Sequence, residues 1–191
     1  MNQPPRKSGR LQLLLLAAVF IGPLLVAAWL YYGGGPMQPE GRSNHGLLLD
    51  PIVNLDERLP GSAIAEQYDQ TWVLVYMNTA VCDENCREAL YTYRQARLML
   101  GKEMDRVARV FLHGQTLPDT VFLAEEHPGL IAIEDSGLAS LLNDHSPADV
   151  PAGGYFLIDP HGNLVMYFRP DLEPAAMVDD LKHLLRLSRI G

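Results

Sequence analysis

The sequence predicts an α/β domain, with a central mixed sheet flanked by helices, that follows an N-terminal membrane-spanning helix. Three observations lead to this prediction. Residues 11–32 are almost wholly apolar. The β-favouring run Trp72–Asn78 predicts a buried strand, and helical residues follow it from about Glu84. Beyond that helix, strand-like and helix-like segments alternate, as they do in α/β folds.

Length and charge limit the possible organisation of the chain. Its 191 residues are enough for one membrane segment and one domain. The formal net charge is −8 and the sequence pI is about 5.1. Because nucleic acids attract surfaces rich in Lys and Arg, an acidic chain argues against a nucleic-acid partner.

The first two segments have the pattern of a membrane anchor. Residues 1–10 form a short tail with three basic side chains, and residues 11–32 would span roughly 33 Å as a helix, enough for a bilayer core. Trp29, Tyr31 and Tyr32 at the far end are typical of an aromatic belt. Positive charge before the span predicts a cytoplasmic N-terminus and an exported domain. We therefore expect a single-pass protein of the bacterial inner membrane with its domain in the periplasm.

A cleaved signal peptide is the alternative for this segment. Val26-Ala27-Ala28 offers a possible cleavage site. The span is long for the apolar part of a signal peptide, and its aromatic end favours an anchor. In either case the cysteines of the chain would face an oxidising compartment.

The remainder divides into a linker and one domain. Residues 33–43 contain three consecutive glycines and two prolines, so we interpret them as a linker. Residues 44–191 form the predicted domain. Residues 56–68 are expected to be a hairpin or loop with a turn at Pro60-Gly61. After the first strand and helix we expect strands at 107–113 and 130–133, helices at 118–126 and 136–142, a hairpin at 155–168, and a C-terminal helix from Pro174.

Cys82 and Cys86 are the only cysteines, and they lie where the first core strand gives way to its helix. At this spacing they can close a disulfide or hold one soft metal ion as two thiolates. A helix N-terminus favours a thiolate, whereas Asp83 and Glu84 oppose a second anion and would attract a bound cation. A purely stabilising disulfide, or two unconnected thiols, is the simpler interpretation.

The order strand, cysteine helix, strand, helix, hairpin, helix is the thioredoxin-like arrangement. With Cys82-x-x-x-Cys86 after the first core strand, and Asp144-His145-Ser146 shortly before the strand at Tyr155, the chain resembles the SCO/SenC family of cytochrome c oxidase assembly proteins. That resemblance implies that Cys82, Cys86 and His145 bind copper. It also implies a partner that is a copper-binding oxidase subunit or another assembly factor.

The chain departs from the family pattern at several places, which marks it as a divergent relative. Asp83 and Arg87 stand where the family has a proline after each cysteine. The segment between Cys86 and His145 is shorter than usual. Pro151 is the candidate for the cis-proline that faces the cysteines in thioredoxin-like oxidoreductases.

Three functions therefore remain open at the level of sequence. The first is a membrane-anchored assembly factor that passes copper to an oxidase through Cys82, Cys86 and His145. The second is a thiol-disulfide reductase that keeps the copper-site cysteines of a partner reduced and needs only the two cysteines. The third is a tethered adaptor without catalysis.

Other residues receive more ordinary interpretations. His113 ends a core strand near the cysteines and is an alternative metal ligand. His45, His127 and His161 are expected at the surface, and Asp179-Asp180 is expected to form a solvated helix face. Tyr91 and Met99 are expected to pack in the core.

Overall fold

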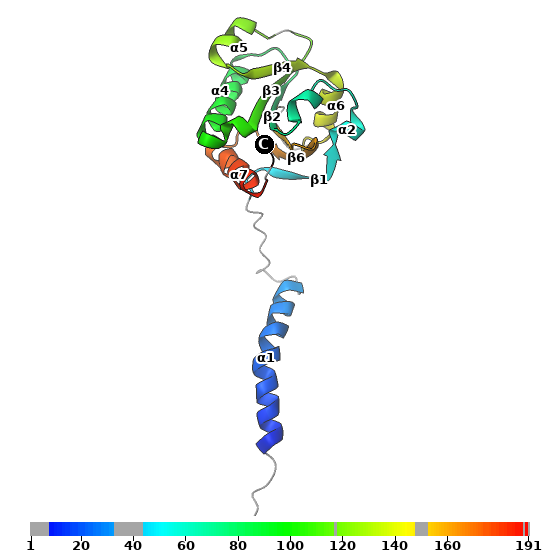
Figure 1. Cartoon of the computed structure of the whole chain (residues 1–191), viewed down its shortest axis with the longest axis vertical. Coiled ribbons are helices and arrows are strands. Elements are labelled where there is room, and N and C mark those ends of the chain that lie inside the picture. Colours follow the sequence, from blue (N-terminus) through cyan, green and yellow to red (C-terminus); the bar gives the residue numbers. More distant parts are fainter. Residues whose placement is uncertain (1–7, 33–43, 117, 148–152, 189, 191) are drawn as a thin grey trace, which may run out of the picture. The chain divides into compact units, whose positions relative to one another are not determined.

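The computed structural model describes residues 8–32, 44–116, 118–147, 153–188 and 190. The chain separates into two compact units, Met1–Ser43 and Asn44–Gly191. In the first unit, α1 (Ser8–Tyr32) contains the stretch Leu11–Leu30, which is long and apolar enough to cross a membrane (Figure 1). A helix of this kind near an N-terminus fits a membrane anchor and also a signal sequence.

The second unit is built on one six-stranded mixed sheet, which confirms the predicted fold class. Its order is β1-β6-β5-β2-β3-β4. Strands β2, β3 and β4 are parallel, and β5, β6 and β1 continue the sheet in antiparallel pairs. The strands are β1 (Leu47–Asn54), β2 (Trp72–Asn78), β3 (Val107–His113), β4 (Leu130–Glu134), β5 (Tyr155–Ile158) and β6 (Asn163–Phe168).

Helices cover both faces of this sheet. They are α2 (Leu55–Arg58), α3 (Ala65–Tyr68), α4 (Glu84–Met99), the 3-10 helix η1 (Gly101–Arg106), α5 (Thr120–Glu126), α6 (Ser136–Asp144) and α7 (Pro174–Leu187). In Figure 1, α4 and α7 lie together on one side of the sheet, while α2 and α6 lie on the other.

Two hydrophobic cores result, and β2 contributes to both. Trp72, Leu74 and Tyr76 point into the core beneath α4 and α7. The alternate residues Val73 and Val75 point into the core beneath α6. Because both faces of the strand are buried, its sequence is apolar without alternation. This double burial explains why the run was easy to recognise in the sequence.

A single hydroxyl fixes α4 against the sheet beneath it. Tyr93 is fully buried, and its hydroxyl donates a hydrogen bond to the carbonyl of Leu74 in β2. The same oxygen accepts the backbone N–H of Val110 in β3 at 2.7 Å. Burial raises the pKa of Tyr93, so the hydroxyl keeps its proton. The Tyr93 side chain thus holds α4, the helix that carries Cys86, against β2 and β3.

Several predicted elements were wrong in detail. Residues 56–68 contain the short helices α2 and α3 in place of a hairpin, and the edge strand β1 was not expected. Helix α5 begins at Thr120 rather than at residue 118 and is capped by Asp119, and α6 is capped by Asp135. In each cap the aspartate side chain accepts the backbone N–H of the residue three positions further along, the usual stabilising arrangement.

Four side chains also lie in environments other than those expected. Asp180 and His127 were expected at the surface and are only 5% and 3% exposed. Tyr91 and Met99 were expected in the core and are 57% and 47% exposed. His45 and His161 are exposed, as predicted.

Candidate functional site

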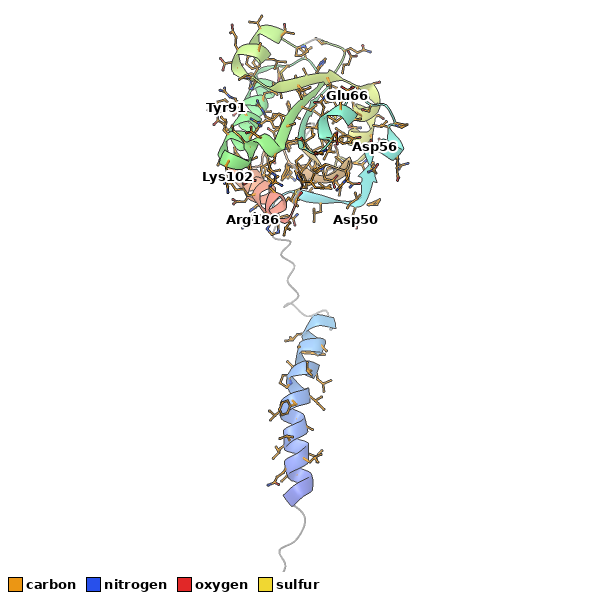
Figure 2. All side chains as sticks on the ribbon, viewed as in Figure 1. Asp50, Asp56, Glu66, Tyr91, Lys102 and Arg186 are labelled. Carbon is orange, nitrogen blue, oxygen red and sulfur yellow. A yellow bond between two sulfur atoms is a disulfide. The ribbon has the colours of Figure 1, made fainter. Side chains whose placement is uncertain are left out.

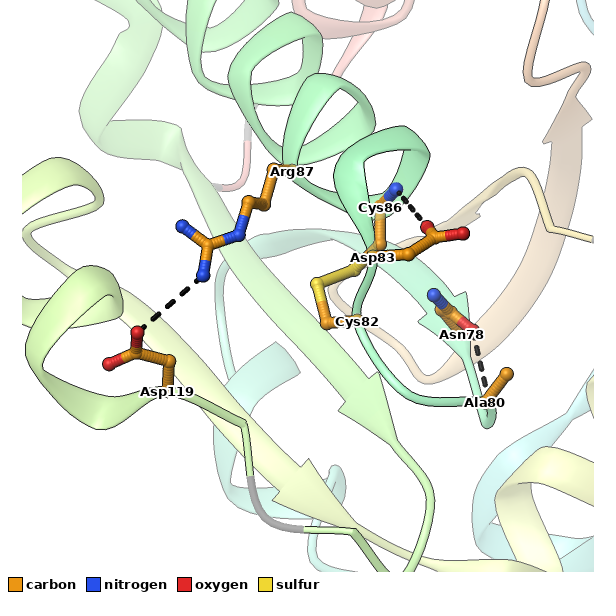
Figure 3. Close-up of a disulfide and its surroundings, with 7 residues drawn as sticks. All are labelled: Asn78, Ala80, Cys82, Asp83, Cys86, Arg87 and Asp119. Atoms are coloured by element: carbon orange, nitrogen blue, oxygen red, sulfur yellow. Dashed lines mark hydrogen bonds and ion pairs between the residues drawn. A yellow bond between two sulfur atoms is a disulfide. The ribbon is translucent and has the colours of Figure 1, made fainter.

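The β2–α4 connection carries the two cysteines, as the sequence predicted. The side chain of Asn78 turns the chain at the end of β2 by accepting the N–H of Ala80 at 3.0 Å. Asp83 then caps α4, and its carboxylate accepts the N–H of Cys86 at 3.1 Å (Figure 3). Because an aspartate at this position starts a helix, Cys82 is held just ahead of α4 and Cys86 in its first turn.

Cys82 and Cys86 are joined by a disulfide, with their Cα atoms 5.1 Å apart. The two cysteines differ in exposure. Cys86 is only 1% exposed, whereas Cys82 is half-buried and packs at the margin of the α4–α7 core. An approaching thiol or thiolate can therefore reach Cys82 more readily than Cys86.

A groove of 660 Å³ opens beside the disulfide on the side of Cys86. Its walls come from the end of β2 and the loop after it, the first turn of α4, the last turn of α6 and the residues after it, and Tyr167 of β6. The lining is mixed, and its polar members include Asn78, Asp83, Asn143 and Ser146. Burial raises the pKa of Tyr76, at the base of this groove, to about 12, with a smaller contribution from the nearby carboxylate of Asp83.

A smaller cavity of 180 Å³ lies on the side of Cys82. Cys82 and His113 line it together, with Phe111 and Asp119 among its other walls. His113 is only 8% exposed, and its Nδ1 lies 2.7 Å from the carbonyl oxygen of Gly114. If Nδ1 donates its proton to that carbonyl, Nε2 keeps a lone pair. The structure thus brings to the cysteine edge the histidine that the sequence marked as an alternative ligand.

The loop before α5 is fastened to the cysteine helix by an arginine that sequence reasoning did not identify. Arg87 follows Cys86, and its guanidinium lies 3.5 Å from the carboxylate of Asp119 (Figure 3). The same guanidinium lies over the ring of Phe122, 4.3 Å from its centre. Since Asp119 also lines the small cavity, these contacts hold that wall close to Cys82. One local sequence signal for this contact was Asp119, an aspartate at the start of α5.

His145 occupies a different position from the one its assigned role suggests. It ends α6, and its Nδ1 lies 2.7 Å from the carbonyl oxygen of Leu141. His145 lines neither of the cavities described at the disulfide, although Ser146 and Pro147 line the larger one. Within the described parts of the chain, no group of three His, Cys, Asp or Glu side chains is placed to hold a metal ion. The assignment of His145 as a copper ligand therefore stays a prediction.

Pro151, the candidate cis-proline, lies outside the described residues. A cis peptide bond does occur at Asp50-Pro51, within the edge strand β1. The groove beside Cys86 reaches Pro147 and Gly153, on either side of the segment that holds Pro151.

Fold and site together define a class of protein: a thioredoxin-like domain with a disulfide at the N-terminus of its first long helix, preceded by an apolar N-terminal helix. Residues 72–188 match the family model described as the transmembrane-like, thioredoxin-like, C-terminal domain, and residues 3–34 match the transmembrane-like, N-terminal domain. The chain therefore belongs to this family of transmembrane-like proteins with a thioredoxin-like C-terminal domain.

Solved structures of similar fold include three Sco proteins. Copper-bound ScoI of Arabidopsis thaliana is 17% identical, with a TM-score of 0.52 over 65% of this chain and 89% of that one. Copper-bound yeast Sco1 is 13% identical, with a TM-score of 0.52 over 65% and 81%. Apo Sco1 of Thermus thermophilus is 19% identical, with a TM-score of 0.50 over 74% and 91%. At these identities the similarity is one of fold. No curated protein matches the sequence.

Proposed function

We propose that the chain is a membrane-anchored thiol-disulfide protein that acts on the cysteines of a partner in the assembly of a respiratory cytochrome oxidase. The observation that carries the proposal is the unequal exposure of two disulfide-bonded cysteines at the start of α4. A purely structural disulfide needs no accessible sulfur, whereas exchange requires one sulfur that can be reached and one that can resolve the intermediate. The partner and the assembly role rest on the SCO-like fold and the predicted anchor.

The reductive reaction follows from this geometry. In the reduced protein, the Cys82 thiolate attacks a disulfide of the partner and forms a mixed disulfide, releasing one partner thiolate. The Cys86 thiolate then attacks the Cys82 sulfur, which releases the second partner thiolate and leaves Cys82–Cys86 oxidised. Two electrons pass to the partner, and a thiol reductant must restore the pair. Asp83 maintains the helix start that places Cys86 beside Cys82.

The groove on the Cys86 side supports the binding of an extended segment of the partner. Its volume of 660 Å³ and its mixed polar and apolar lining suit a short peptide stretch that carries the target disulfide. Cys86 and Asp83 border the groove directly, so a bound segment would lie beside Cys86, the resolving cysteine, with Cys82 joined to it by the disulfide.

The test is to trap the mixed disulfide with the full chain in detergent. A peptide with an internal disulfide between two cysteines four residues apart serves as the substrate, and reduced Cys86→Ser should accumulate a covalent adduct at Cys82. Reduced Cys82→Ser should form little adduct, because its remaining thiol is buried. The matched control is an isolated peptide with the sequence of residues 80–87. Exchange in the full chain no faster than in this control would refute a catalytic role.

Copper handling is the second candidate function, and one observation favours it. Cys82 and His113 line the same cavity, and two thiolates with one imidazole suit Cu(I). The site as described does not assemble a third ligand, so binding would require reduction of the disulfide and movement of a side chain. Copper would then be cargo, and the same two sulfurs would serve both functions.

A competition titration separates the two functions. The reduced full chain is titrated with Cu(I) against a chelator, together with His113→Ala and His145→Ala. One ion per chain with weakened binding in His113→Ala supports a copper site at the small cavity, and weakened binding in His145→Ala supports the ligand set of the SCO resemblance. If the reduced chain binds no Cu(I) but still exchanges disulfides, copper handling is eliminated and the thiol-disulfide function is retained.

A further inference from the structure

A basic pocket lies at the opposite end of α4 from the disulfide. It has a volume of 580 Å³ and is formed where the turn from α4 into η1 meets α7. Four basic side chains line it, Lys102, Arg106, Lys182 and Arg186, against two acidic ones, Glu103 and Asp179. The pocket is therefore a local excess of positive charge.

Of the four basic side chains, Arg106 has a structural role, and the other three face solvent. Arg106 donates hydrogen bonds to the carbonyls of Leu185, Ser188 and Ile190, and it pairs with Glu103 at 2.9 Å. This network fixes the end of α7 against η1. Lys102, Lys182 and Arg186 are exposed around the pocket, and the Lys102 side chain is 91% exposed.

The pocket contrasts with the charge of the domain as a whole. From residue 44 onward the sequence has 22 Asp and Glu against 11 Lys and Arg. Figure 2 shows Lys102 and Arg186 on the side of α4 and α7, whereas Asp56 and Glu66 lie on the side of α2 and α3. The basic side chains around the pocket would attract an anionic surface to this side of the domain.

The same helix α7 holds the point where the linker enters the domain. The buried carboxylate of Asp180 accepts the backbone N–H groups of His45 and Gly46 at 2.8 and 2.7 Å. Asp180 precedes Arg186 by six residues, about 9 Å along a helix. The 11 residues between α1 and the domain span at most about 40 Å. A tether of this length allows the basic pocket to reach a bilayer that α1 crosses.

Exposed apolar side chains occur at the ends of the same two helices, α4 and α7. Leu187 of α7 is 71% exposed, and Leu98 and Met99 at the end of α4 are 48% and 47% exposed. Basic side chains next to exposed apolar ones are the composition of surfaces that bind the headgroup region of membranes.

We propose that Lys102, Lys182 and Arg186 bind the phosphates of anionic phospholipids in the bilayer that carries α1. The proposal rests on the membrane anchoring in the proposed function, and not on the disulfide chemistry. An acidic domain would otherwise be repelled by an anionic leaflet, so binding through this one face also fixes its orientation.

The orientation has a consequence for the disulfide. Cys86 lies in the first turn of α4 and the basic pocket adjoins its last turn, and 16 helical residues span about 24 Å. With the pocket on the headgroups, the disulfide is presented away from the bilayer, where the soluble part of a partner can reach it.

The test uses the full chain in nanodiscs that carry a gadolinium-chelate lipid headgroup. The bilayer is phosphatidylcholine alone or mixed with phosphatidylglycerol, and paramagnetic broadening of methyl signals is measured. We expect several-fold stronger broadening of Leu187 and Met99 than of Val81, beside the disulfide, only in the mixed bilayer. The triple variant Lys102→Glu, Lys182→Glu, Arg186→Glu should lose this difference, and the matched control Arg58→Glu should keep it.

Three results would overturn the proposal. Equal broadening of Val81 and Leu187 would mean that the domain has no preferred orientation. Added inorganic phosphate that shifts the same methyl signals over phosphatidylcholine, without lipid-dependent broadening, would mean that the pocket binds the free ion. A chain that does not insert would remove the anchor on which the proposal rests. Because the triple variant retains both cysteines, failure here leaves mixed-disulfide trapping unchanged, so the two proposals fail separately.

Discussion

The carboxylate of Asp180 accepts the backbone N–H of Gly46 at 2.7 Å and so joins α7 to the chain segment that enters the domain. The same carboxylate accepts the N–H of His45, and it is almost fully buried. A buried carboxylate with two charge-assisted hydrogen bonds stabilises a fold chiefly because removing it leaves both donors unpaired. Gly46 is required at this point, since a Cβ there would overlap Met166 and Phe168.

Asp180→Ala should therefore lower the free energy of unfolding by about 2–4 kcal/mol. Urea denaturation of the full chain in detergent measures the change. The matched control is Asp179→Ala, because Asp179 is exposed on the same turn of α7. Equal losses in the two variants would contradict a structural role that belongs to Asp180.

Tyr93→Phe should cost about 1–3 kcal/mol, since it removes one hydroxyl that serves both β2 and β3 and leaves their backbone groups unpaired in the core. Tyr91→Phe is the control, because Tyr91 lies on the same helix with its side chain exposed. Thermal unfolding compares the two. A Tyr93→Phe protein as stable as Tyr91→Phe would show that the hydroxyl does not hold α4 in place.

Gly114→Ala tests whether the close contact between Gly114 and Thr79 positions the loop that carries Cys82. A Cβ at Gly114 would overlap the backbone of Thr79, three residues before Cys82. We expect the loop to shift, so that the half-buried Cys82 becomes more exposed and its disulfide is reduced at least severalfold faster by a small thiol. Rates of reduction by dithiothreitol measure this change. An unchanged rate in a folded variant would show that the contact with Thr79 does not position the pair.

His127 predicts a pH dependence of stability. Burial lowers the pKa of His127, and the nearby Arg109 and Arg94 lower it further. The unfolded chain therefore binds the proton more readily, and stability is lost as the pH falls through the ordinary histidine range near 6.5 toward the lower pKa of the folded state. Above that range the residue is neutral in both states and contributes no pH dependence.

Comparing urea unfolding at pH 7.5 and 5.5 measures this loss. His127→Gln should lose less stability between the two pH values than the parent chain does. His161→Gln, at an exposed turn, should behave like the parent. Carboxylates titrate in all three proteins and cancel in the comparison. An identical loss in His127→Gln would contradict a buried neutral histidine.

The sequence predicted the centre of the domain better than its periphery. The strand at Trp72–Asn78 was predicted because a doubly buried strand is uniformly apolar, and the helix after it was predicted to begin at about Glu84, where α4 does begin. The strand β1 was missed because it lies at the sheet edge, pairs irregularly, and contains Pro51, which argues against a strand in a local pattern.

The burial of Asp180 could have been predicted from the helical period. Neighbouring helical residues differ by about 100° around the axis, so Asp179 and Asp180 cannot share a face. Asp180 is three residues from Met177 and four from Leu184, both of which pack in the core. The helical period therefore placed Asp180 beside the apolar stripe, although no local pattern indicated its distant partners His45 and Gly46.

The site was predictable only where short-range sequence patterns determine it. The cysteine pair could be located from the strand and helix that flank it. The cavity that Cys82 and His113 share depends on the pairing of β2 with β3, which aligns Asn78 with His113. The contact of Arg87 with Asp119 depends on the packing of α5, which short-range patterns do not determine.

The most direct test of the central claim is the reduction of the Cys82–Cys86 disulfide in the folded full chain. A glutathione redox buffer is equilibrated with the protein, free thiols are alkylated after acid quenching, and the reduced fraction is read by mass spectrometry. Unfolding is followed in parallel by hydrogen exchange of the core strands β2 and β3. We predict reversible reduction with both strands still protected, because Cys82 is accessible in the native state. Reduction only at the rate of global unfolding would contradict the account and leave the disulfide a structural crosslink.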